Sequence, residues 1–320
     1  MRRKTSTLTT DDFAFVPASA AAPGDGELLV RTRFIALDPY LARAMRAGAG
    51  EDADWPDGVI EGRVVAEVLE TRSPRFASGQ LVSGIGRWQQ EQVVDAASFE
   101  PIAANIDPPS LSLGVFGRSG ITAWVGLHLA KPLSGETLLV SAASGPVGSV
   151  VGQLAKKRGL RVVGTAGGLH KCAYVIEDLG FDACLDHRSP DFESEIAVAA
   201  NGGFDILFEN VGGPSLDAAL PAMKHGGRIM LCGLAAHYND DDPLVLRNFK
   251  NLLYRSLSLR GFVTAEHPDL FAPALAELQG GIDSGDIGHR ETIIDGIDCA
   301  PAAYLEMLAG QGVGKRLIRP

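Results

Sequence analysis

The chain has 320 residues, a formal net charge of -10 and an isoelectric point near 5.2. This length corresponds to about two domains, and a hydrophobic content of 46% is ample for a buried core. The acidic balance argues against nucleic acid and anionic membranes as partners, because both select clustered Lys and Arg.

The N-terminal stretch "MRRKTSTLTTDDF" has basic residues but no apolar run behind them, so we expect no secretory signal. No apolar run reaches the roughly 18 residues that a membrane helix needs, and we expect no membrane partner. The cysteines, Cys172, Cys184, Cys232 and Cys299, are far apart and form no CxxC. Free thiols in a reducing compartment suit this spacing better than disulfides or structural zinc. The expected protein is a cytoplasmic enzyme without a metal site.

Residues 26–101 contain short apolar runs broken by Gly, Pro and Asp, such as "ELLVRTRFIAL" and "GVIEGRVVAEVLE". Runs of this length, rich in Val, Ile and Leu, predict strands. We expect antiparallel β structure here, in a small barrel. From Ser110 the spacing of apolar residues becomes helical, and a domain boundary is predicted near Gly117 to Gly120.

Beyond that boundary, strand-like and helical segments alternate. The strands "TLLVSA", "RVVGTA", "ACLDH", "FDILFEN" and "RIMLCG" are separated by helical segments predicted at 146–158, 170–179, 191–200 and 214–223, with a further helix at 269–280. Short, nearly continuous apolar strands between helices predict a parallel sheet covered on both faces. The tail "CAPAAYLEMLAGQGVGKRLIRP" predicts a helix, a glycine turn and a strand that rejoins the first domain.

A glycine-rich turn follows the first of these parallel strands. Ala142, Gly145 and Gly148 fit the pattern A-x-x-G-x-x-G, and Pro146 suits the first turn of the next helix. Small residues there let the backbone approach a pyrophosphate closely, while the helix N-terminus offers free N–H groups to the anion. A tight strand-to-helix turn of any α/β protein can show the same pattern, but its place inside a βαβ unit favours a dinucleotide site.

The next strand indicates which dinucleotide is bound. An NAD site needs Asp or Glu roughly 20 residues after the glycines, whereas an NADP site needs a small residue there and a nearby cation. The strand "RVVGTA" runs into "GGLHK", with no carboxylate and with Lys171 close by. The sequence therefore favours NADP(H), although Lys171 can also be read as a solvated lysine at a helix start.

Three further loops should lie at the carboxyl ends of the parallel strands, where ligands bind in open α/β sheets. They are 209–213, 232–239 and 261–264, and each is polar or glycine-rich. Each loop by itself could be polar or glycine-rich only because it forms a turn. The position of all three at the same edge of the sheet favours a role in cofactor binding.

The order of several motifs resembles the zinc-independent medium-chain dehydrogenases/reductases, specifically the branch of prostaglandin reductases, leukotriene dehydrogenases and plant alkenal double-bond reductases. These motifs are "LDPYLAR", "GITAWVGL", "VSAASGPVGSVVGQLAKKRG", "VVGTAGGLHK", "LGFD", "FENVGG", "GGRIMLCG", "HYN", "NLL" and "GKRLI". The resemblance implies a GroES-like, β-rich catalytic domain of residues 1–118 and 285–320, and a doubly wound Rossmann NADP-binding domain of residues 119–284. It also implies a homodimer.

The same resemblance implies NADPH-dependent reduction of the carbon-carbon double bond of small α,β-unsaturated aldehydes and ketones. It implies that Tyr40 and Tyr238 face the substrate as catalytic residues. The residues assigned to the cofactor are Gly145, Pro146, Val147, Gly148, Gly167, Lys171, His187, Asn210, Cys232, Gly233, Tyr238, Phe262, Val263, Thr264 and Gly312.

Three positions depart from the family pattern. The family's "DYK", whose Tyr helps to hold the 2′-phosphate, is Asp186-His187-Arg188 here, so His187 or Arg188 can take that role and make it pH-sensitive. An Asn that is usual in the C-terminal "NxGK" is Gly312, which removes one expected hydrogen bond to the cofactor. Arg118 and Ser119 replace small residues before "GITAW", which hints at a more polar substrate or only at a surface arginine.

No cluster of Cys, His and Glu has the spacing of a catalytic zinc site, which disfavours alcohol oxidation. The expected chemistry is hydride delivery to the β-carbon of an enone, with Tyr238 and the nicotinamide ribose donating to the carbonyl oxygen and Tyr238 or water protonating the α-carbon. Tyr238 can equally be a packing residue. Two other functions stay open: a quinone reductase of the same superfamily, and a non-enzymatic NADPH-binding protein.

Overall fold

The computed structural model describes residues 7–47, 55, 57–240 and 242–320. The chain forms two compact units, each described by itself below. The first unit takes residues 1–114, 238–241 and 291–320, and the second unit takes residues 115–237 and 242–290. Residues 238–241 therefore group with the first unit, whereas the sequence analysis placed them in the second domain.

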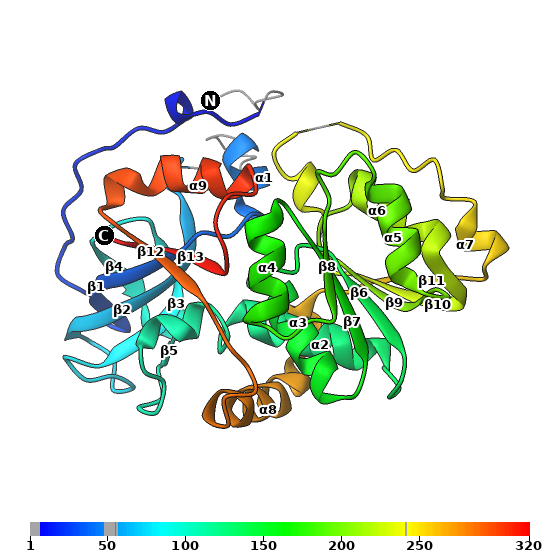
Figure 1. The fold of residues 1–320 in the computed structure, drawn as a ribbon. Coiled ribbons are helices and arrows are strands. Elements are labelled where there is room, and N and C mark those ends of the chain that lie inside the picture. Colours follow the sequence, from blue (N-terminus) through cyan, green and yellow to red (C-terminus); the bar gives the residue numbers. More distant parts are fainter. Residues whose placement is uncertain (1–6, 48–54, 56, 241) are drawn as a thin grey trace. The chain divides into compact units, whose positions relative to one another are not determined.

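The first unit is built around a sheet from both ends of the chain, as the blue strands and the red C-terminal strand of Figure 1 show. Its strands are β1 (Glu27–Ala36), β2 (Glu61–Thr71), β3 (Leu81–Arg87), β4 (Glu91–Asp95), β5 (Phe99–Pro101), β12 (Glu291–Asp295) and β13 (Lys315–Arg319). They follow the order β12-β13-β1-β2-β3-β5, with β4 also paired to β1. The predicted antiparallel pairing is confirmed for β1 through β5.

The C-terminal strand rejoins this sheet, as predicted. Ile35 of β1 pairs with Ile318 of β13, and both side chains are buried in the core of the first unit. Alternate residues of β1 point into that core, as a strand with one buried face requires. Helices α1 (Leu41–Ala47) and α9 (Ala300–Leu308) belong to the same unit, with 3₁₀ turns at Thr10–Asp12, Ala96–Ser98, Pro109–Leu113 and Ile297–Cys299.

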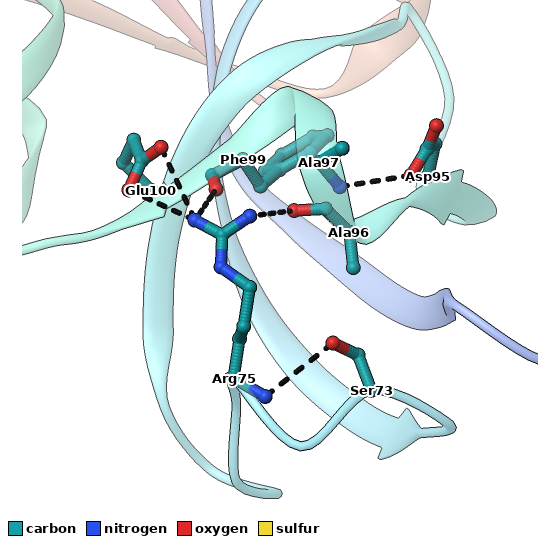
Figure 2. A network of polar contacts seen from close by, with 7 residues as sticks. All are labelled: Ser73, Arg75, Asp95, Ala96, Ala97, Phe99 and Glu100. Atoms are coloured by element: carbon teal, nitrogen blue, oxygen red, sulfur yellow. Dashed lines mark hydrogen bonds and ion pairs between the residues drawn. The ribbon is translucent and has the colours of Figure 1, made fainter.

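A polar network around Arg75 fixes the turn before β5 (Figure 2). The guanidinium donates to the carbonyl oxygens of Ala96 at 3.2 Å and Phe99 at 3.5 Å, and it meets both carboxylate oxygens of Glu100 at 3.2 Å. Asp95 begins the 3₁₀ turn by accepting from the Ala97 N–H at 2.8 Å. The network holds β5 against the loop that follows β2.

The second unit is a parallel sheet with the order β11-β10-β9-β6-β7-β8. Its strands are β6 (Thr137–Val140), β7 (Arg161–Ala166), β8 (Ala183–Asp186), β9 (Phe204–Glu209), β10 (Met223–Leu231) and β11 (Ser258–Gly261). This is the doubly wound order of a Rossmann sheet, so the predicted parallel architecture is confirmed. The strand order reverses between β6 and β9, and ligands bind outside the carboxyl ends at such a point.

Helices cover both faces of this sheet (Figure 1). They are α2 (Arg118–Ala130), α3 (Gly148–Lys157), α4 (Leu169–Glu177), α5 (Phe192–Ala200), α6 (Gly213–Ala219), α7 (Asn251–Tyr254) and α8 (Phe271–Asp283), with 3₁₀ turns at Leu220–Ala222, Ala235–His237, Thr264–Glu266 and Pro268–Leu270. Helices α2, α3 and α8 lie on one face, and α5 and α6 lie on the other.

Most of the predicted helix limits differ from the structure by one to four residues, and two of these differences have a clear local cause. The helix predicted at 146–158 begins at Gly148, because Ala142 to Val147 form the turn itself and Pro146 lies before the helix. The helix predicted at 214–223 ends at Ala219, since Pro221 has no N–H with which to continue it. Met223 already belongs to β10.

Candidate functional site

The glycine turn between β6 and α3 is closed tightly against its own backbone. Ala142 has φ +49°, in the left-handed region, and its carbonyl oxygen accepts from the Gly145 N–H at 2.9 Å. A Cβ at Gly148 would lie 2.4 Å from that same oxygen, so only glycine fits there. Pro146 and Val147, on the rim of the turn, are half-buried. A tight glycine turn that leads into a helix N-terminus is the arrangement that pyrophosphate sites use.

Glycine also fixes how α3 packs. A Cβ at Gly152 would lie 1.8 Å from the Phe181 ring, so the helix can sit this close to its neighbours only without a side chain there. This is the close-packing role that the third glycine of a dinucleotide-binding turn has.

The carboxyl ends of β6 and β9, where the strand order reverses, are joined by side chains. The Asn210 amide donates to the Ser141 carbonyl at 2.8 Å, and the Asn210 N–H donates to the Ser141 hydroxyl at 2.8 Å. Glu209 is completely buried, and its Oε1 accepts from Ser141 and from the N–H groups of Val211 and Gly212. Burial raises the pKa of the Glu209 carboxyl, and these donors oppose that shift. These hydrogen bonds hold Asn210 at the point between β6 and β9 where the strand order reverses.

Cys232 and Gly233 belong to the same edge. Their N–H groups donate to the Glu209 carbonyl at 2.8 Å and 3.2 Å, which ties the loop after β10 to the end of β9. Burial, with the nearby Glu209 carboxyl, raises the pKa of the Cys232 thiol to about 12. The thiol is therefore protonated at neutral pH, and it is not a nucleophile.

Residues 262–264 follow β11. Phe262 meets the Phe208 ring edge-on at 6.2 Å between centroids, and Gly126 leaves the space that both rings fill. Thr264 is buried and shares a hydrogen bond of 2.7 Å with the Thr122 hydroxyl. Val263, between them, is 55% exposed. Of the three residues, Val263 is the one whose side chain is open to a ligand.

A group of basic side chains gathers where β7 and β8 end. A Cβ at Gly167 would lie 2.9 Å from His187 Nε2 and 3.0 Å from Arg188 Nε, so both side chains pack on the glycine turn. The charge of Lys171, in the first turn of α4, also reaches His187. Asp186 accepts from the N–H groups of Gly168 at 2.8 Å and Arg188 at 3.0 Å, which fixes the turn. The arrangement suits a phosphate monoester.

Tyr40 and Tyr238 both lie in the first unit. Tyr238 is half-buried and packs on the main core of that unit, while its neighbour Asn239 accepts from the Leu8 N–H at 3.0 Å. Tyr40 is 47% exposed at the end of a short turn after β1.

The turn that carries Tyr40 is held by two buried residues from the far end of the chain. The Tyr304 hydroxyl lies 3.2 Å from the carbonyl oxygens of both Asp38 and Pro39. The Lys315 ammonium forms an ion pair with the Asp38 carboxylate and donates to the Leu37 carbonyl at 3.3 Å. Burial and the nearby Asp38 raise the pKa of the Tyr304 hydroxyl. Tyr304 and Lys315 were not among the predicted site residues.

Gly312 has φ +84° in the turn before β13. This left-handed conformation is open to Gly and, at some cost, to Asn, which is the residue usual in the family motif. The backbone shape of the motif is therefore compatible with either residue, and the substitution removes a side-chain amide.

A groove of about 1920 Å³ in the first unit lies elsewhere. It is lined by residues of the N-terminal segment, β1, the 87–91 turn and α9, among them Phe13, Trp55 and Trp88. Neither Tyr40 nor Tyr238 lines it. We assign it no part in the site.

Comparison with known proteins shows the family. Residues 146–280 match the family described as zinc-binding dehydrogenase, and residues 1–102 match the N-terminal domain of oxidoreductase. NADPH-dependent curcumin reductase of Escherichia coli (strain K12) is 38% identical over 97% of this chain and 92% of its own length. The NADP(+)-dependent 2-alkenal reductase of Nicotiana tabacum is 33% identical over 92% of this chain and 88% of its own. The chain belongs to the zinc-independent medium-chain dehydrogenase/reductase superfamily, in its prostaglandin and alkenal reductase branch.

The solved structures agree. CurA from Vibrio vulnificus in complex with NADPH has a TM-score of 0.92 at 33% identity, over 99% of this chain and 97% of that chain. The predicted family is confirmed, and so is the predicted fold class of a Rossmann unit with a β-rich, GroES-like unit.

Within the described residues, no group of three or more His, Cys, Asp or Glu side chains is arranged to hold a metal ion. No helix in the described ranges has the length and apolar character needed to cross a bilayer.

The sequence analysis did not predict the residues that hold the candidate site residues in place. Ser141, Thr122 and Asp186 hold Asn210, Thr264 and the Gly167 turn, respectively, through the contacts above. The sequence does show that Ser141 and Asp186 lie at the ends of predicted strands. It does not show which residues they contact, because sequence spacing does not give cross-strand contacts.

Proposed function

We propose that this chain reduces the carbon-carbon double bond of small α,β-unsaturated aldehydes and ketones with NADPH. Membership in the family makes it an NADP-dependent oxidoreductase. The relatives named for curcumin and 2-alkenal reduction support the substrate class. The observation that carries the proposal in this chain is the group of Lys171, His187 and Arg188 beside Gly167, together with the lack of any Asp or Glu in the sequence of the turn directly after β7.

The residues present fit a phosphorylated dinucleotide. The pyrophosphate would lie on the turn from Gly145 to Gly148, where a Cβ has no room at Gly148. Lys171 and His187 would hold the 2′-phosphate beside the Gly167 turn. Asn210, the backbone of Cys232 and Gly233, Tyr238 and residues 262–264 would line the ribose and nicotinamide, and the Gly312 turn would contribute backbone only.

When bound, NADPH supplies the hydride for the β-carbon. Negative charge then develops on the carbonyl oxygen of the substrate, so a donor aimed at that oxygen lowers the barrier most. We assign this donation to the Tyr238 hydroxyl, which afterwards protonates the α-carbon directly or through water. Tyr40 is exposed on the turn that Tyr304 and Lys315 hold, and we assign it to contact with the substrate.

An assay of NADPH oxidation on a panel of enals, enones and quinones, with and without a chelator, tests this function. We expect turnover of enals and enones that is unaffected by the chelator. Turnover of quinones alone would favour the quinone reductase, and loss of activity with the chelator would contradict a metal-independent mechanism.

We further propose that the protein works in the cytoplasm as a homodimer, as the family resemblance implies. Sedimentation of the purified chain tests the dimer: a single species of monomer mass at micromolar concentration would contradict it.

A further inference from the structure

The side chain at position 187 is a histidine on the surface that we assign to the 2′-phosphate. His187 Nε2 lies within 2.9 Å of the place where a Gly167 Cβ would be, so the imidazole edge borders the glycine turn. Arg188 approaches the same place with its Nε at 3.0 Å and its Cζ at 3.1 Å. These two side chains fill the space next to Gly167, so a phosphate bound beside this turn would meet the imidazole and the guanidinium together.

Several charged groups surround the imidazole. Loss of hydration lowers the pKa of His187, as does the positive charge of Arg188, with a smaller contribution from Lys171. The Asp186 carboxylate acts in the opposite direction. Asp186 is itself occupied by two backbone N–H groups, and its pKa lies below the usual range because of them. Without a bound anion, loss of hydration and, after it, the neighbouring cations therefore favour the neutral form of His187.

We propose that His187 couples the binding of NADP(H) to the uptake of a proton, so that affinity for the phosphorylated dinucleotide falls as pH rises. The inference rests on the proposed function, because it places the 2′-phosphate at Gly167. A phosphate dianion beside the imidazole stabilises its charged form, which raises the His187 pKa on binding. Binding then takes up protons at any pH between the pKa values of the free and the occupied states.

The direction of the effect follows. Below the free-state pKa, His187 is already charged, and binding takes up no proton. Above it, the dianion must recruit a proton, so affinity falls about tenfold for each pH unit until the occupied-state pKa is passed. The second pKa of the phosphate, about 6, sets the acid limit of the useful range.

Calorimetric titration of the whole protein with NADPH, in buffers of different ionisation enthalpy between about pH 6.5 and pH 8.5, measures both affinity and protons taken up. The test variants are His187→Asn and His187→Tyr, the second restoring the residue of the family motif. His225→Asn is the matched control, because His225 is an exposed histidine of the same unit on β10.

We expect wild type and His225→Asn to take up a substantial fraction of a proton and to bind about tenfold more weakly at the alkaline end. Both His187 variants should bind NADPH with proton uptake near zero and with little change in affinity over this range. Equal proton uptake in wild type and the His187 variants would overturn the inference while leaving the proposed function intact. Failure of the folded wild type to bind NADPH at any pH would overturn both.

Discussion

The Ser141 hydroxyl donates to Oε1 of Glu209 at 3.0 Å, across the point where the strand order of the second unit reverses. This bond joins the ends of β6 and β9 beneath the loop that carries Asn210. Its acceptor is a completely buried carboxyl, and the other carboxylate oxygen has no hydrogen-bond partner among the described residues. A titratable group therefore lies beneath the edge of the sheet at which the strand order reverses.

The buried carboxyl of Glu209 predicts a pH dependence of stability. Burial raises its pKa above 4.5, so the folded chain holds the proton to higher pH than the unfolded chain does. Its contribution to the free energy of unfolding is therefore full below the unfolded pKa, and it falls as pH rises through the folded pKa. The side chain of Glu209→Gln stays neutral at all pH values. The free energy of unfolding of this variant, relative to that of wild type, should therefore rise by about 1–3 kcal/mol as the pH increases from about 5 to about 8. Urea unfolding at both pH values measures the difference, and a gain that does not change with pH would contradict it.

Gly148→Ala should abolish tight NADPH binding. Its Cβ would lie 2.4 Å from the Ala142 carbonyl oxygen, and backbone on both sides has to move to relieve the clash. The turn would then lose the shape that admits the pyrophosphate. Quenching of protein fluorescence by NADPH measures the loss. Gly280→Ala is the control, since nothing lies within 4 Å of a Cβ there and its helix gains in propensity.

Lys315→Met should destabilise the first unit by about 3–5 kcal/mol, because it leaves the Asp38 carboxylate buried without its partner. The double variant Asp38→Asn with Lys315→Met should recover much of this loss, since no unpaired charge remains. Denaturant unfolding of the four chains gives the coupling energy. Purely additive losses would show that the pair does not act as a unit.

Tyr238→Phe should lower kcat for enone reduction by about 10²- to 10³-fold, the usual cost of losing one oxyanion donor. KM should change little if the hydroxyl acts mainly in the transition state. Tyr254→Phe, at an exposed tyrosine of α7, is the matched control. Steady-state kinetics with NADPH settle the role of the residue: unchanged turnover would make Tyr238 a packing residue.

Much of the fold follows from local pattern. The strands β6, β7 and β9 are short apolar runs buried throughout or nearly so, and the turn between β6 and α3 has no room for a side chain at Gly148. Such features are visible over a few residues. The limits of α3 and α6 were misplaced because turn geometry and Pro221 act at the scale of one residue.

The support of the site could not be predicted in the same way. Lys315 meets Asp38 across 277 positions of sequence, and Ser141 meets Glu209 across 68. Such pairs depend on which strands become neighbours, and that is decided by the whole sheet. The cluster around Gly167 could be predicted in part, because Lys171 and His187 follow two consecutive strands of the sheet and therefore come near one another.

The destination of the hydride tests the central claim most directly. The protein is given an enone and NADPH deuterated on the transferring face of the nicotinamide, and the product is examined by NMR. The account predicts deuterium on the β-carbon of a saturated ketone. Deuterium on the carbonyl carbon of an unsaturated alcohol would contradict it.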